Sequence, residues 1–187
     1  MLESGHSSID SLIDVFDPSK SNLHSKEMIS LLDSLSGEVM KGNTPEFLKF
    51  LGKMESDSRL KARVSGYNTD PSKGKVKTAS GIYQFTKPTV ESTKRSAKTN
   101  VGFDEAYIDA ISDDPTKWNL EQSNIMALAK LFPAIIEGHP GLVDSLLKSS
   151  FKSNYDKNAW ERVYGDSWHT DVDSPTQKRL DKILKKY

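Results

Sequence analysis

The stretch from Leu120 to Glu137 limits what this chain can fold into more than any other segment. A helix over this stretch is apolar on nearly every side and contains one proline, Pro133. Such a helix is normally buried inside a domain. Pro133 should kink the helix or end it early, because proline removes a helical hydrogen bond. The sequence therefore predicts a central buried helix; its apolar positions are Ile125, Leu128, Ala129, Leu131, Phe132, Ile135 and Ile136.

Shorter amphipathic segments are available to surround that helix. Apolar residues recur at helical spacing between turn signals, and Thr44-Pro45-Glu46 combines a capping hydroxyl, a proline in the first turn and an early acid. The segment from Ser56 to Ser80 is polar, so we expect it to be irregular or a small β-hairpin. The predicted fold is mostly α with a minor β element. We expect the shorter helices at residues 8–16, from Ser25, from Thr44, at 86–98, at 104–111, from Leu142 and from Ser174.

The length and charge of the chain set broad limits on its class. Its 187 residues are enough for one domain of ordinary size with a small appendage. We predict a helical N-terminal segment over residues 1–43, able to bind partner proteins, and a main domain over 44–187. Acidic and basic residues balance at 26 each, which argues against a nucleic-acid partner.

Several classes of site are excluded or unsupported by composition. The chain has no cysteine, which rules out disulfides, thiolate metal sites and a cysteine nucleophile. Its four histidines are isolated and have no metal-ligand spacing, so we expect no metal and no cofactor. No apolar run is long enough to span a membrane. The first residues, MLESGHSSIDSL, lack the basic start of a signal peptide, so we expect none.

Glu55 is the main candidate for chemistry. It lies at the end of the amphipathic helix predicted from Thr44 and is followed at once by Ser56. Glycosidic cleavage needs an acid that delivers a proton to the leaving oxygen. Apolar neighbours such as Leu51 and Met54 keep a carboxyl group protonated, because they disfavour its charged form. The alternative is a solvated carboxylate at a helix end, the usual setting of a glutamate.

A second motif follows the polar loop. Gly81 permits a tight turn or a close approach of a sugar to the backbone, and Gln84 offers both a donor and an acceptor for an N-acetyl or hydroxyl group. Tyr83 and Phe85 could supply apolar surroundings for the acid. The alternative is a strand whose side chains alternate between core and surface. The motif reads Ser80-Gly81-Ile82-Tyr83-Gln84-Phe85, with Thr89 shortly after it.

Together these motifs resemble the soluble lytic transglycosylases and their phage-encoded relatives over about Thr44 to Thr93. The shared order is Glu-Ser at a helix end, a small-residue turn with glycine, an aliphatic-aromatic-Gln run and a threonine. The resemblance implies a lysozyme-like α+β fold and cleavage of the MurNAc–GlcNAc β-1,4 bond of peptidoglycan. It implies that Glu55 acts as acid and then base, giving 1,6-anhydro-MurNAc ends without a second carboxylate.

The resemblance also assigns substrate-binding positions. It places Gln84 in the groove beside the acid, and it matches Ser56 and Ser80 to positions that orient the acid. Thr89 matches a family threonine; its alternative role is helix capping or packing. The remaining positions expected to line the groove are Gly81, Tyr83, Phe85, Trp168 and His169.

The end of the chain departs from the bacterial pattern. The Tyr-Asn-Ala-Gly motif of that pattern is absent, and Tyr164-Gly165-Asp166-Ser167-Trp168-His169-Thr170-Asp171 resembles the ending of phage tail and virion transglycosylases. Trp168 and His169 could equally be a packed tryptophan and a surface histidine. The resemblance implies a phage enzyme, either an endolysin in the host cytoplasm or a part of the virion, that acts on the wall in the periplasm.

Two other functions stay open at this point. One is a hydrolase (muramidase) on the same fold, which would need a second carboxylate such as Asp70 or Glu91. The other is a non-enzymatic wall-binding module of a virion. The presence of both Glu55 and Gln84 argues against the second alternative.

Overall fold

The computed structural model describes residues 14–62, 79–138, 178–179, 181–183 and 185. Within these residues the protein is mostly helical with one small two-stranded sheet, as the sequence predicts. The expected helix from Leu142 lies outside the described residues, while residues 178–179 and 181–183 of the expected C-terminal helix are helical. In the part of the chain that is described, no helix is both long and apolar enough to cross a membrane.

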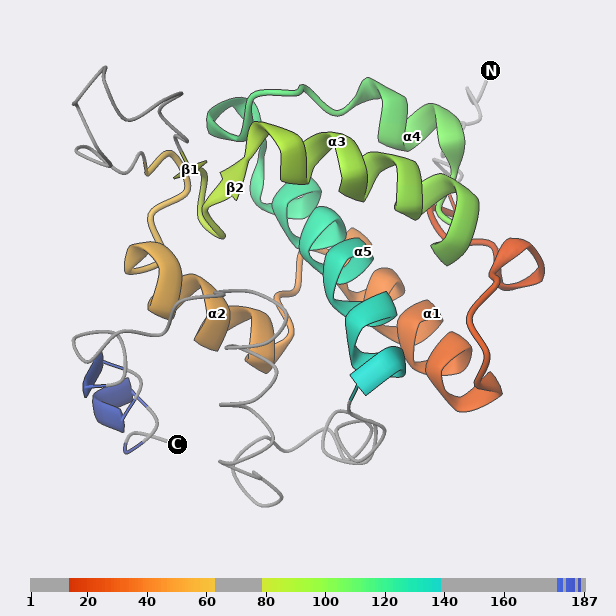
Figure 1. The fold of residues 1–187 in the computed structure, drawn as a ribbon, viewed down its shortest axis with the longest axis horizontal. Coiled ribbons are helices and arrows are strands. Elements are labelled where there is room, and N and C mark those ends of the chain that lie inside the picture. The colour runs from red at the N-terminus through yellow and green to blue at the C-terminus, as the bar shows by residue number, and fades with distance from the viewer. Residues whose placement is uncertain (1–13, 63–78, 139–177, 180, 184, 186–187) are drawn as a thin grey trace, which may run out of the picture.

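Helix α5 (Leu120–Gly138) lies at the centre of the fold, with α3 on one side and α1 on the other (Figure 1). Its residues 125–129 are completely or almost completely buried, and so is Phe132. This confirms the predicted central helix. Pro133 lies inside the helix and does not end it, since α5 continues to Gly138.

Helix α1 (Lys26–Met40) packs along α5. Ser25 caps it by accepting a hydrogen bond from the Met28 amide at 3.3 Å. Met28, Leu32 and Val39 are buried in the same core as α5. This region therefore belongs to that core; the domain boundary at residue 43 stays a prediction.

Residues 14–16 are not helical, so the helix predicted over residues 8–16 is wrong at its end. Phe16 forms an isolated antiparallel bridge with Phe103. The Asp17 amide donates to the Gly102 carbonyl, and the Asp104 amide donates to the Val15 carbonyl, both at 2.9 Å. These backbone groups bond to a distant part of the chain instead of forming a helix. Residues 8–13 lie outside the described part.

Helix α2 (Glu46–Ser56) begins as the sequence predicts, but its start is not capped by a side chain. The Thr44 hydroxyl instead accepts a hydrogen bond from the Asn124 amide at 3.1 Å, which ties the start of α2 to α5. After α2, strands β1 (Ala79–Ser80) and β2 (Phe85–Thr86) pair antiparallel, with Ser80 opposite Phe85.

The middle of the chain continues from β2 directly into helices. Helix α3 (Lys87–Ser96) is capped by Thr86 and runs into the π-helical turn η3 (Ala97–Val101). Helix α4 (Glu105–Ala110) follows, capped by Asp104. These elements confirm the helices expected over 86–98 and 104–111. Two short 3-10 turns, η1 (Pro18–Lys20) and η4 (Pro115–Lys117), complete the described elements.

Candidate functional site

Glu55 lies in the last turn of α2 and is partly buried. The helix ends directly after it, because Asp57 adopts a left-handed conformation with φ 54°. Met54 and Leu51, one and four positions earlier, are buried in the core. Glu55 thus directly follows residues of the apolar core; an apolar setting for its carboxyl group stays a prediction.

Ser56 fixes the end of α2 against the β-hairpin that β1 and β2 form. Its side chain is buried, and its hydroxyl donates to the Ile82 carbonyl at 2.8 Å. The Arg59 amide donates to the same hydroxyl at 3.1 Å. Gly52, one turn earlier, has no room for a side chain without displacing Ile82, since a β-carbon there would lie 3.2 Å from the Ile82 side chain. The backbone that carries Glu55 is therefore held against the Ser80–Phe85 turn.

The glycine of that turn is needed for a close contact within the protein. Gly81 has φ 79°, and a β-carbon on it would lie 3.0 Å from the Pro115 side chain. The Gly81 amide donates to the Ala62 carbonyl at 2.8 Å. The sequence allowed either a tight turn or a close approach of a sugar, and the structure places Pro115 against this glycine.

Gln84 adopts a left-handed conformation that is uncommon for a residue with a side chain, with φ 52°. Its amide nitrogen donates to the Gly81 carbonyl at 2.7 Å, which closes the turn. Its carbonyl oxygen Oε1 is buried and accepts no hydrogen bond within the described structure. Gln84 is partly exposed as a whole, although this oxygen is not.

Tyr83 and Phe85 are core side chains in this structure. The Tyr83 hydroxyl donates to Oδ1 of Asn124 at 2.6 Å, and burial raises the pKa of this hydroxyl. Phe85 packs edge to face on Trp118, with ring centroids 5.2 Å apart. Both side chains are almost fully buried, as is that of Ser80. These three residues pack the hairpin against the core and do not present their side chains to solvent.

Thr89 belongs to the start of α3. Its amide donates to the Thr86 hydroxyl at 3.4 Å, and the two threonine hydroxyls lie 2.8 Å apart. Thr86 is therefore the capping residue of α3, and Thr89 carries the amide that is capped. Glu91 is exposed on the same helix. Asp70, Trp168 and His169 lie outside the described residues.

Lys130 belongs to none of the motifs that the sequence singles out. It projects from α5 with its ammonium nitrogen 5.7 Å from the centre of the Phe85 ring. Burial lowers the pKa of Lys130 to about 8, while the negative charge of Glu55 acts in the opposite direction. The structure thus brings Glu55, Phe85 and Lys130 into one neighbourhood. A signal was available, since Lys130 is the only charged residue between Ile125 and Ile136.

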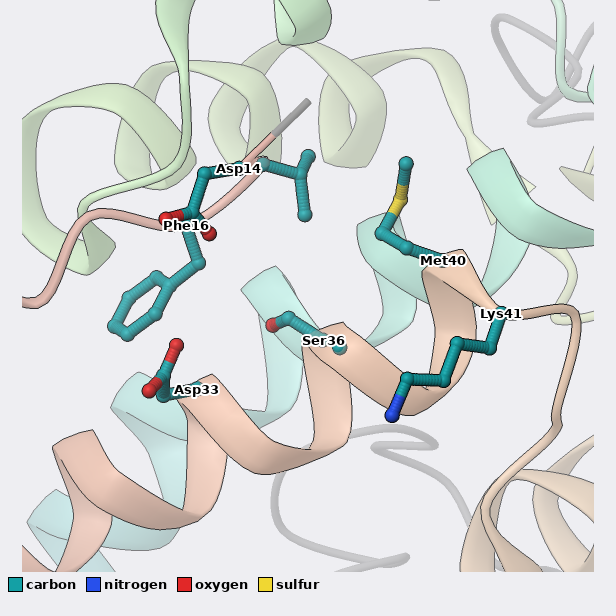
Figure 2. A pocket seen from close by; sticks show the side chains of 8 residues that line it. Asp14, Phe16, Asp33, Ser36, Met40 and Lys41 are labelled. Carbon is teal, nitrogen blue, oxygen red and sulfur yellow. The ribbon is translucent and has the colours of Figure 1, made fainter. Parts of the chain in front are cut away.

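A separate hollow of about 300 Å³ lies between residues 14–16 and α1 (Figure 2). In Figure 2, Phe16 and Asp33 line one side, and Met40 and Lys41 lie at the other end. None of its lining residues comes from α2, the hairpin or α5. The hollow is not part of the Glu55 neighbourhood. No group of three or more His, Asp or Glu side chains in the described regions could hold a metal ion.

No family model, curated protein or solved structure matches this chain.

Proposed function

We propose that this protein is a peptidoglycan lytic transglycosylase that cleaves the MurNAc–GlcNAc β-1,4 bond, with Glu55 as the acid and then the base. The observation that carries the proposal is the join between α2 and the hairpin: the Ser56 hydroxyl bonds to the Ile82 carbonyl. This bond holds the carboxyl-bearing end of α2 against the motif that contains Gln84. The order of residues in the two motifs, and its resemblance to the transglycosylases, supplies the reaction.

The proposed chemistry needs one carboxyl group. Glu55 gives its proton to the glycosidic oxygen while the bond from that oxygen to the anomeric carbon breaks. The N-acetyl group of the substrate stabilises the anomeric carbon. The Glu55 carboxylate then takes the proton of the 6-hydroxyl of MurNAc as O6 bonds to the anomeric carbon. The ring that closes is 1,6-anhydro-MurNAc, and no water enters the product.

The supporting residues divide into two groups under this proposal. Ser56, Ser80, Gly81, Tyr83 and Phe85 build the frame, because their side chains are buried or, for Gly81, packed against Pro115. Gln84 and Thr89 are partly exposed, so we propose them as the members of the set that reach the glycan. Trp168 and His169 stay proposed as the far wall of the groove.

The biological setting follows from the resemblance alone. We propose a phage enzyme that acts on the glycan strands of the wall, either as an endolysin or as part of the virion. In a virion, the N-terminal residues would contact other virion proteins.

The decisive experiment is mass spectrometry of the products from purified peptidoglycan sacculi. We expect muropeptides ending in 1,6-anhydro-MurNAc, one water lighter than hydrolysis products. Glu55→Gln should reduce the rate by at least about a hundredfold, because it removes the only proton donor proposed. The matched control is Glu46→Gln, which changes an exposed acid at the other end of α2, paired with Lys49 at 2.7 Å.

Three results would change the conclusion. Products with reducing ends would make the protein a hydrolase and require a second carboxylate. Full activity in Glu55→Gln would overturn the role of Glu55. No digestion of several wall types by a folded sample would favour a wall-binding module.

A further inference from the structure

Lys130 is an unusual residue for its position. Helix α5 is buried on nearly all sides, and every residue from Ile125 to Phe132 other than Lys130 is apolar. A lysine in such a place costs stability unless its charge is paired or neutralised. Its aliphatic stem could be replaced by an apolar side chain of the same length. The charge therefore needs an explanation beyond packing.

The charge of Lys130 meets two groups of the proposed site. Its nitrogen lies 5.7 Å from the centre of the Phe85 ring, within the range of a cation–π contact. Glu55, in the last turn of α2, is the charged group whose attraction acts on Lys130. Phe85 belongs to the hairpin motif and Glu55 to the end of α2, so Lys130 connects both motifs to the central helix.

Charged groups on the elements that pack against α5 have other partners or are exposed. On α1, Glu38 pairs with Lys41 at 3.0 Å. On α3, Lys94 pairs with Asp113 at 2.8 Å, and on η3, Lys98 pairs with Asp109 at 2.7 Å. The exposed charged residues of these elements are Lys26, Glu27, Asp33, Lys87, Glu91 and Arg95.

We propose that Lys130 is a positioning residue for Glu55: its ammonium orients the carboxyl group and stabilises the negative charge that develops there during proton donation. This inference rests on the proposed function. As the O–H bond of Glu55 breaks, the proton passes to the glycosidic oxygen and the electron pair stays on the carboxylate. Lys130 keeps its own protons throughout. A fixed positive charge that is already in place stabilises that developing charge without reorganisation.

The same charge has an opposite effect before the reaction. A nearby ammonium favours the ionised carboxylate, so it lowers the fraction of Glu55 that is protonated at a given pH. Removing the charge should therefore change the pH profile in two ways. The highest rate should fall, and the alkaline limb of the profile should move to higher pH. A residue that only fills space would lower the rate equally at every pH.

The test compares initial rates of muropeptide release from sacculi between pH 4 and pH 9. For Lys130→Met we expect a maximal rate lower by about tenfold and an alkaline limb higher by about one pH unit. Lys130→Arg keeps the charge and should keep the limb in place. Lys98→Met is the matched control, since Lys98 also lies on an element packed against α5 but pairs with Asp109. An unmoved limb in Lys130→Met would overturn the proposal.

A second measurement does not depend on activity. The carbon-13 resonance of the lysine Cε methylene reports the protonation of each lysine in the intact protein. In Glu55→Gln, the pKa of Lys130 should fall further below about 8, because the attraction of Glu55 is lost. An unchanged pKa would mean that the two charges do not interact, and would overturn this proposal even if the wall is cleaved. A falling pKa with an inactive wild type would instead overturn the proposed function.

Discussion

Replacing Lys130 with methionine should make the protein more stable at neutral pH. The ammonium of an exposed lysine loses its proton near pH 10.5, whereas the pKa of Lys130 is about 8. That difference corresponds to about 3 kcal/mol against the charged side chain in the folded state. Lys130 is only partly buried by its exposed area, so solvent screens some of this cost and we expect a gain of about 2 kcal/mol. Methionine has a similar length and flexibility and should occupy the same space.

The stabilisation should depend on pH in a defined window. Between about pH 8 and pH 10.5, Lys130 is largely neutral in the folded chain but still protonated in the unfolded chain. The unfolded state then binds more protons, so the contribution of Lys130 to the free energy of unfolding rises with pH. The advantage of Lys130→Met should be full below pH 8 and should disappear above about pH 10.5.

Urea unfolding followed by tryptophan fluorescence and circular dichroism at pH 7, 8.5 and 10 measures this difference. An unchanged slope with a shifted midpoint would identify a change in stability alone. In the control Lys98→Met, an ion pair between a partly buried lysine and an exposed aspartate is lost, and the change should be within about 1 kcal/mol. A Lys130→Met protein that is less stable by the same amount at every pH would refute the reasoning. Greater stability with lower activity would show that Lys130 is retained for function.

Three other substitutions test the packing around the site. Gly102→Ala should cost at least about 2 kcal/mol in urea unfolding, because a β-carbon would lie 2.9 Å from the Asp17 carbonyl at a φ of 101°. Tyr83→Phe removes the 2.6 Å hydrogen bond to Asn124 and should cost about 1–2 kcal/mol; an unaltered melting curve would contradict that bond. Thr86→Ala removes the cap of α3 and should cost about 1 kcal/mol, whereas Thr86→Ser should restore most of it.

The sequence predicts the helices of this fold well, because the signals are local. The capping residues Ser25, Thr86 and Asp104 act on amides three positions later, so the start of each helix depends on residues close in the sequence. The apolar character of α5 marks it as the central helix. Of the two effects predicted for Pro133, a kink or an early end, the early end is wrong, since the helix continues past it. Packing on all sides of a helix can outweigh one missing hydrogen bond.

The errors come from contacts between distant parts of the chain. The sequence around Phe16 has a helical pattern, but its backbone pairs with residues 102–104 instead. Thr44 was expected to cap α2, but its hydroxyl bonds to Asn124, 80 positions away. No local pattern contains such partners.

The candidate site was predictable only in part. Glu55 and Gln84 stand out because of their motifs. The order of residues does not show whether the side chains of Tyr83 and Phe85 face the groove or the core. Lys130 was visible as the only charged residue between Ile125 and Ile136, but a sequence does not show which surface that charge faces. Only the folded structure shows that Lys130 lies near the Phe85 ring and within the electrostatic influence of Glu55.

The extended segment around Phe16 has a consequence for synthesis of the chain. It is fastened to the region of Phe103, and the Asn22 side chain bonds to the Thr99 carbonyl, 77 positions later. During translation, Met28 and Leu32 of α1 stay exposed until α5, the helix that α1 packs against, has been synthesised. Contacts so far apart in sequence slow folding, and apolar surface that stays uncovered invites aggregation. Nascent chains that stop before α5 should therefore depend on chaperones. The segment around Phe16, α1 and α5 should become ordered together, late in translation.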